Sequence, residues 1–356
     1  MRIVVEWVRK YERRLGYTAL LGGFIVDSLT LRRIDLLPEN LAIISYLAVI
    51  LFSILLMHLD AGKFHRFGII PRLAPFLPIT MQFAFGALFS GFVIFYSRSA
   101  AVGASWPFLL LLVLLLIGNE SFRGRYERLN FRLGLFFFGL LTYSVLALPV
   151  FIGEIGDHVF MVSVVIAMFL SALVIEGLRR LAPDIVDTER KILYAIVVGV
   201  SMLFSLAYFY NIIPPVPLIL KSAGVAHEVK KVAPGTYQAQ VEPKKNFGFT
   251  TPIFHRAGNE PAYVWSSIFA PAQLSTTVLH VWYLKDSVGV WKVMQTVPIE
   301  IVGGRDGGFR GYSLRSSLTA GEWRVDVQTP RGQLLGRINF KVEAVSAPVA
   351  LKRFDL

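Results

Sequence analysis

Seven apolar segments fill the chain as far as Tyr210, and they limit what this part can fold into more than any other feature. In lipid, every backbone N–H and C=O group needs a partner within the protein, so isolated apolar runs form helices. A spanning helix needs about 20 apolar residues, and most of the runs reach that length. The segments lie at 17–31, 41–59, 73–96, 101–117, 131–152, 159–178 and 192–210.

Basic residues decide whether the first segment, which is short and carries Asp27, spans the membrane. If all seven segments span, 16 lysines and arginines fall on one side and 3 on the other; if the first does not, the split is 11 against 8. Because basic loops stay in the cytoplasm, we expect seven spanning helices in a bacterial inner membrane. The N-terminus is then cytoplasmic and the C-terminal region extracytoplasmic, which is periplasmic in a Gram-negative cell. The larger set is Arg2, Arg9, Lys10, Arg13, Arg14, Lys63, Arg66, Arg72, Arg123, Arg125, Arg128, Arg132, Arg179, Arg180, Arg190 and Lys191, and the smaller set is Arg32, Arg33 and Arg98.

Two shorter features complete the predicted domain boundaries. Residues 1–16 place apolar side chains on one helical face and basic ones on the other, which predicts an interfacial amphipathic helix. Three prolines in the stretch 212–218 end the last apolar segment, since proline lacks the backbone N–H that a helix needs. We therefore predict an interfacial helix at 1–16, a membrane domain at 17–211, a hinge and linker at 212–234 and a β domain at 235–356.

After the hinge, the hydrophobic period changes from that of helices to that of strands. Val297, Ile299 and Ile301 alternate with polar residues, and so do Trp323 and Val325. About seven short strands separated by glycine- and proline-containing turns predict an antiparallel sandwich. Roughly 120 residues suit one immunoglobulin-like domain. The predicted fold class is thus an all-α membrane bundle followed by an all-β immunoglobulin-like sandwich.

Composition excludes several classes of function. The sequence contains no cysteine, which rules out disulfides, thiolate chemistry and cysteine-ligated metals. The net charge of +12 favours contact with anionic lipid headgroups rather than nucleic acid, because no nucleic-acid-binding motif is present. Glu154, Asp157 and His158 match no metal-ligand spacing and indicate a solvated loop. We expect no cofactor and no metal, and the missing catalytic motifs argue against an enzyme.

Asp27 is the candidate site in the membrane domain. A carboxylate inside an apolar segment usually faces a partner or a wet cavity. Arg32, Arg33 and Asp35 follow it at the end of the same segment. These four residues predict either a structural ion pair, or a polar cavity that handles a proton, an ion or a lipid.

The candidate binding residues of the β domain are aromatic side chains and arginines. Such sets bind sugars by stacking, anions through the guanidinium fork, or protein partners. His280 and Trp282 share one strand face and Tyr283 lies on the other, so part of the set belongs to the core. The set comprises His280, Trp282, Tyr283, Trp291, Arg305, Arg310, Tyr312 and Arg315.

Several stretches carry a resemblance to a known family. They are Gly303–Ser313, Gly321–Val327, Gly332–Arg337 with Phe340, and His280–Tyr283, together with Phe24–Leu31, Arg33–Asp35 and Ile213–Leu218. These stretches are similar to an uncharacterised bacterial integral membrane family, in which a domain of unknown function follows a multi-helix membrane domain. The resemblance covers most of the chain. It implies a bacterial membrane protein with an appended β module and implies no activity.

Two functions remain open at this point. The first is a non-enzymatic envelope protein, a subunit or scaffold whose external sandwich binds a protein partner or a glycan. The second is a transporter or lipid-handling protein that works through the Asp27 region. The sequence shows no inverted repeat of the kind many transporters carry, which favours the first.

Overall fold

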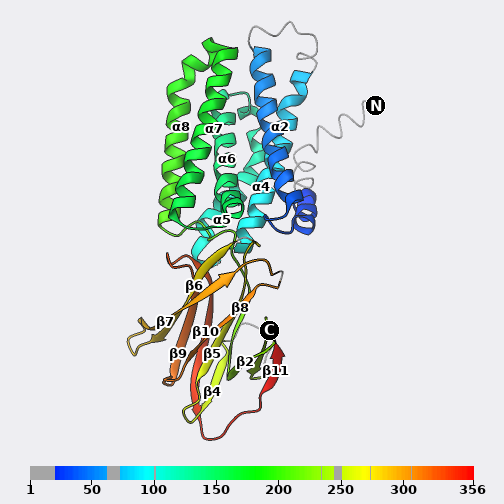
Figure 1. The fold of residues 1–356 in the computed structure, drawn as a ribbon. Coiled ribbons are helices and arrows are strands. Elements are labelled where there is room, and N and C mark those ends of the chain that lie inside the picture. Colours follow the sequence, from blue (N-terminus) through cyan, green and yellow to red (C-terminus); the bar gives the residue numbers. More distant parts are fainter. Residues whose placement is uncertain are drawn as a thin grey trace, which may run out of the picture. The chain divides into compact units, whose positions relative to one another are not determined.

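A computed structural model describes residues 21–61, 73–99, 102–233, 235–243, 251–272, 274–305 and 307–356 (Figure 1). The chain divides into two compact units, a mainly helical one that holds most of the residues up to Ile213 and a β unit made mainly of Pro214–Leu356. The interfacial helix predicted at 1–16 and the basic residues Lys63, Arg66 and Arg72 lie outside the described residues.

The helical unit contains seven helices in its described residues, beside two short 3-10 segments. Six are long and apolar enough to cross a membrane, and the seventh, Leu21–Thr30, is shorter. This agrees with a multi-pass membrane protein. The long helices are α2 (Leu37–Ala61), α4 (Leu77–Ser99), α5 (Val102–Gly118), α6 (Leu129–Ile152), α7 (Asp157–Leu181) and α8 (Pro183–Phe209), and the 3-10 segments are η1 (Ala74–Phe76) and η2 (Asn119–Arg125).

Helix α4 supplies much of the interior of the helical unit. Phe85, Phe89 and Phe92 on this helix are fully buried. Helix α6 approaches it closely at Gly139, where a Cβ would lie 2.8 Å from Leu88 Cδ2. A small residue at this position therefore lets the two helices pack at short distance, as is common between membrane helices.

The described residues of the β unit form three open sheets. Neighbouring strands run antiparallel, except that β4 and β10 are parallel. The five-stranded sheet has the order β4 (Ile253–Ala257), β10 (Leu334–Val345), β9 (Gly321–Gln328), β6 (Ser275–Lys285) and β7 (Trp291–Val302). The three-stranded sheets have the orders β1 (Ile219–Ala226), β5 (Ala262–Phe269), β8 (Phe309–Arg315), and β11 (Lys352–Asp355), β3 (Thr236–Val241), β2 (Glu228–Ala233).

Two cores join the sheets. The larger holds Trp282 and Trp323 from the five-stranded sheet and Val264 from β5, so one face of each of these sheets packs on the other. The smaller lies around Trp265 and Ala239, so the second face of the β5 sheet packs on β2 and β3. The three sheets thus form successive layers, and the strand alternation seen in the sequence places the large apolar side chains between them.

The structure departs from the sequence prediction in the segment 212–234. We expected a hinge and linker there, but residues 219–233 contain strands β1 and β2. Strand β2 exposes most of its side chains and β1 is only half-buried. Lysines and small residues therefore interrupt the apolar alternation in both strands, and the sequence pattern did not reveal them. Strands β4 and β11 were also not predicted, and both are short strands at sheet edges.

Candidate functional site

Asp27 is half-buried on the Leu21–Thr30 helix and contacts helix α4. Ser90 Oγ donates a 2.6 Å hydrogen bond to Asp27 Oδ2. Arg33 instead pairs with Asp35, to which its Nε and Nη2 atoms donate hydrogen bonds of 3.0 and 2.5 Å. Arg32 is exposed. Asp27 thus contacts Ser90, and Arg33 contacts Asp35.

Arg98 makes a contact in this region that the sequence did not reveal. Its guanidinium lies at the end of the Leu21–Thr30 helix and donates to the carbonyls of Ser28 (3.2 Å), Leu31 (2.7 Å) and Arg32. A cation at a helix C-terminus neutralises the unpaired carbonyls there. In the sequence, Arg98 appeared only as one of three basic residues predicted on the outer side.

Two of the predicted binding residues of the β unit belong to the core. His280 and Trp282 are fully buried. The His280 ring is hydrogen-bonded to Ser266 Oγ (2.8 Å) and Ser313 Oγ (2.9 Å), and Trp282 Nε1 donates to Ser313 Oγ at 3.0 Å. Burial lowers the pKa of His280 to about 4, which keeps the ring neutral. These side chains are satisfied inside the protein and are not available to a partner.

Tyr283 lies on the opposite face of the same sheet, beside a closed cluster of arginines. The Arg324 guanidinium lies 4.3 Å from the centre of the Tyr283 ring and 4.8 Å from that of Trp291. Arg324 Nε is 3.3 Å from Asp326 Oδ1, and Arg337 donates to both oxygens of Asp326 at 2.7 and 3.0 Å. The hydrogen bonds from Arg337 complete the coordination of this buried carboxylate and raise the pKa of Arg337.

Arg305 and Arg310 form a second arginine cluster, at the turn between β2 and β3. Arg310 Nη1 donates to the carbonyl of Gly235 at 3.2 Å. A Cβ on Gly235 would lie 2.7 Å from Arg305 Nη1, so the second guanidinium contacts the same residue. Gly235 has a φ of +78°, a conformation that glycine adopts readily. The turn therefore brings two cations against one backbone segment.

This second cluster contains no counter-charge among the described residues. No described carboxylate lies within 4.0 Å of either guanidinium, and Arg310 Nε is buried without a hydrogen-bond partner. Tyr312, on the same strand as Arg310, is 39% exposed, and its ring centre lies 6.2 Å from that of Tyr237. Guanidinium groups arranged in this way match a carboxylate or a phosphate, which accept two parallel hydrogen bonds.

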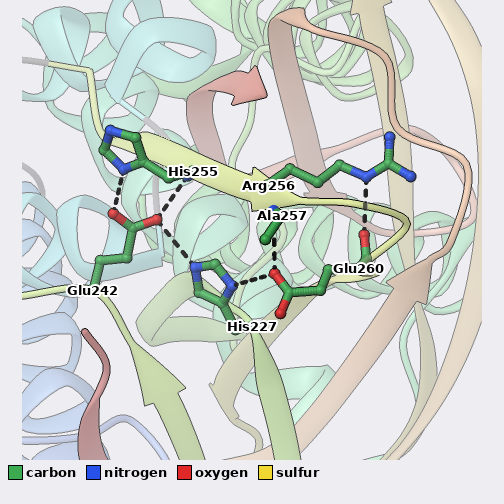
Figure 2. Close-up of polar contacts among 6 residues, drawn as sticks. All are labelled: His227, Glu242, His255, Arg256, Ala257 and Glu260. Atoms are coloured by element: carbon green, nitrogen blue, oxygen red, sulfur yellow. Dashed lines mark hydrogen bonds and ion pairs between the residues drawn. The ribbon is translucent and has the colours of Figure 1, made fainter. Parts of the chain in front are cut away.

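A group of histidines and glutamates lies at the opposite end of the same hairpin (Figure 2). His227 Nε2 is 3.0 Å from Glu242 Oε1, and His227 Nδ1 is 3.4 Å from Glu260 Oε2. Glu242 also accepts from the backbone N–H of His255 at 2.7 Å and from its Nδ1 at 2.6 Å. The His227 ring stacks on Phe254 with centres 4.2 Å apart.

These hydrogen bonds set the ionisation of Glu242. Burial by itself raises the pKa of this carboxyl, but the bonds from the His255 backbone, the His255 ring and His227 outweigh it and lower the pKa. Sequence analysis missed the group because its members lie in four separate segments. In the described part of the chain, no three or more histidine, aspartate or glutamate residues are arranged to hold a metal ion.

Comparisons with known proteins support the domain order and do not supply a function. The family model described as "Protein of unknown function (DUF2914)" matches residues 275–342, which run from the first residue of β6 into β10. This match and the six apolar helices before it fit a membrane domain followed by a domain of unknown function. No curated protein matches the chain.

A solved structure aligns with most of the present chain, but the similarity between the two structures is weak. The alkylpurine DNA glycosylase AlkC of Pseudomonas fluorescens, bound to DNA containing an abasic site analog, aligns with 88% of this chain and 100% of that chain. The identity is 11% and the TM-score is 0.22. A similarity at this level carries no argument about the fold or the function of the present chain.

Proposed function

We propose that the chain is a non-enzymatic scaffold or subunit of the bacterial inner membrane, whose β unit lies outside the cytoplasm and binds an anionic partner. In this proposal the β unit is an immunoglobulin-like module. Its partner is an acidic protein or an acidic glycan. The observation that carries the proposal is the pair Arg305 and Arg310, which converge on Gly235 without a counter-charge among the described residues.

The asymmetry of basic residues supports the orientation. With seven spanning helices, the loops predicted on the cytoplasmic side hold 16 lysines and arginines against 3 on the other side. Six described helices are long and apolar enough to span, and Leu21–Thr30 is the described part of the seventh segment. The β unit follows the last of these helices, so it lies on the side of the basic-poor loops.

The orientation has a direct test, because the chain contains no cysteine. Ser287 is exposed in the turn between β6 and β7, and Glu127 is exposed between η2 and α6. We expect a membrane-impermeant maleimide to label Ser287→Cys in intact spheroplasts and to label Glu127→Cys only after the membrane is permeabilised. The reverse pattern would place the β unit in the cytoplasm.

The chemistry of the site favours a carboxylate ligand. Two guanidinium groups offer paired N–H donors, and the buried Nε of Arg310 gains a partner when an anion is bound. The exposed Tyr312 ring beside them offers an amphipathic surface for the rest of the ligand. A carboxylate is common to acidic proteins and to uronic-acid glycans, so the probes must separate these two sources.

The experiment uses the full-length protein in nanodiscs of zwitterionic lipid at low ionic strength. Polyglutamate, a uronic-acid oligosaccharide and inorganic phosphate are titrated separately, with a neutral dextran as the blank. We expect at least one carboxylate polymer to bind, and Arg310→Gln to weaken this binding by about tenfold, since one lost charge-assisted contact is worth roughly 1.5 kcal/mol.

Arg337→Gln is the matched control, because it removes the same charge from the other arginine cluster, where Asp326 already occupies the guanidinium. We expect it to leave the affinity unchanged at a temperature where the variant is folded. Equal affinities of the wild type and Arg310→Gln for every probe would overturn the proposal. Binding of phosphate alone would restrict the partner to phosphate-bearing molecules.

A further inference from the structure

The hairpin formed by β2 and β3 is held at both ends by charged side chains. Its tip, Gly235, accepts a hydrogen bond from Arg310. At its open end, His227 precedes β2 and Glu242 follows β3, and the His227 backbone N–H donates to the Gln240 carbonyl at 2.8 Å. The open end is therefore the place where the hairpin is fastened to the rest of the unit.

The surroundings of His227 favour a ring that carries a proton on each nitrogen. The side chain is only 4% exposed, and its two nitrogens face oxygens of Glu242 and Glu260. A neutral imidazole has one N–H, so one of these contacts would set a lone pair against a carboxylate oxygen. The doubly protonated ring donates in both directions.

The other polar groups around the ring keep both carboxylates in place. His255, on β4, donates twice to Glu242. The backbone N–H of Ala257 donates to Glu260 Oε2 at 3.4 Å, and Arg256 Nε donates to the Glu260 carbonyl at 3.1 Å. Because these partners hold the two carboxylates against His227, a deprotonated ring would remain facing them.

We propose that His227, when protonated on both nitrogens, latches the open end of the β2–β3 hairpin, where Glu242 lies, to Glu260 in the turn before β5, and that loss of this proton loosens the hairpin. The latch also regulates anion binding at the hairpin tip, a step that rests on the proposed function. Anion affinity is then high where His227 is charged and lower where the ring is neutral. Arginine does not titrate in this range, so the arginine pair alone has no such dependence.

The latch is tested by histidine ring ¹⁵N NMR of the full-length protein in nanodiscs, together with hydrogen exchange. The chain has 6 histidines, and His227→Gln identifies the signal of interest. At the acidic end of a pH series, we expect both ring nitrogens of His227 to be protonated. As the ring loses its proton at higher pH, we expect amide exchange in β2 and β3 to rise more steeply than the intrinsic increase with pH, by about tenfold, equivalent to roughly 1.4 kcal/mol.

His255→Gln is the control, because it retains the backbone N–H that donates to Glu242 and leaves both contacts of His227. A His227 ring that keeps one unprotonated nitrogen throughout the pH series would overturn the latch, and so would an unchanged pH dependence of exchange in His227→Gln. The NMR and hydrogen-exchange measurements need no ligand, so they test the latch even if the anion-binding proposal fails. If anions bind equally well to the wild type and His227→Gln across this pH range, the regulatory step is wrong.

Discussion

Two arginine clusters of the β unit use the same residue type for opposite purposes. Arg324 and Arg337 surround the buried carboxylate of Asp326, and their charges are partly neutralised inside the protein. Arg305 and Arg310 meet at a backbone turn, where no described carboxylate pairs with them. Among the described residues the difference lies in one acidic side chain, and we propose that it separates a cluster that stabilises a sheet from a cluster that is open to an outside ligand.

The largest effect should come from making the closed cluster resemble the open one. Asp326→Asn removes the carboxylate, leaves two arginines without their acceptor and should destabilise the protein by about 2 kcal/mol. This is below the usual cost for a fully buried pair because Arg337 is 42% exposed. Thermal unfolding of the full-length protein measures the loss. An unchanged midpoint would mean that the Tyr283 and Trp291 rings alone hold Arg324.

A second prediction concerns Glu242, whose carboxylate is hydrogen-bonded to His227 and His255. The lowered pKa of Glu242 means that its ionised form stabilises the fold, so this contribution is complete above the unfolded-state pKa and is lost as the pH falls through the folded-state value. Glu242→Gln should cost about 1.5 kcal/mol near neutral pH and flatten the acid side of the stability profile. Thermal midpoints of both proteins at several acidic pH values test this. A profile as steep as that of the wild type would assign the acid sensitivity to other carboxylates.

The third change makes the open cluster resemble the closed one. Thr236 is exposed and adjoins Gly235, so Thr236→Glu brings a negative charge to the turn at which Arg305 and Arg310 meet. We expect a stability gain of about 0.5 kcal/mol, typical of a surface ion pair, and a loss of polyglutamate or oligosaccharide binding. Thr236→Gln is the neutral control. If Thr236→Glu binds these probes as the wild type does, the ligand does not occupy this site.

The smallest effect is expected in the helical unit. Asp27→Asn retains an oxygen that accepts the hydrogen bond from Ser90, so the thermal midpoint should change little, by less than about 0.5 kcal/mol in stability. Arg98→Gln should cost more, because Arg98 contacts three carbonyls at the end of the same helix. A larger loss for Asp27→Asn would return attention to a functional carboxylate in the membrane.

The periodicity of the sequence predicted the elements whose burial is regular. Apolar runs located the six long helices, and strict alternation located β7 and β9. Strand β2 was missed because Lys230 and Lys231 are exposed side by side. The parallel pairing of β4 with β10 could not be predicted, since pairing between segments this far apart in the sequence leaves no local pattern.

The candidate site was predicted only in part, because local sequence patterns do not show which distant residues meet. Composition identified Arg305, Arg310 and Tyr312, but it could not show that the two arginines meet at Gly235. Alternation correctly put His280 and Trp282 on one strand face without revealing that this face is the core. The partners of His227 lie 15 and 33 residues away, at distances that only the completed sheets determine.

The parallel pairing of β4 with β10 has a consequence for the order of folding. Residues 253–257 must wait for residues 341–345, so a loop of more than 80 residues closes before this edge is complete. His255 on β4 and Glu242 are only 13 residues apart, so their contact closes a short loop and can form before this step. The pairing of β4 with β10 is thus the reporter of finished folding, and trapped intermediates should lack it.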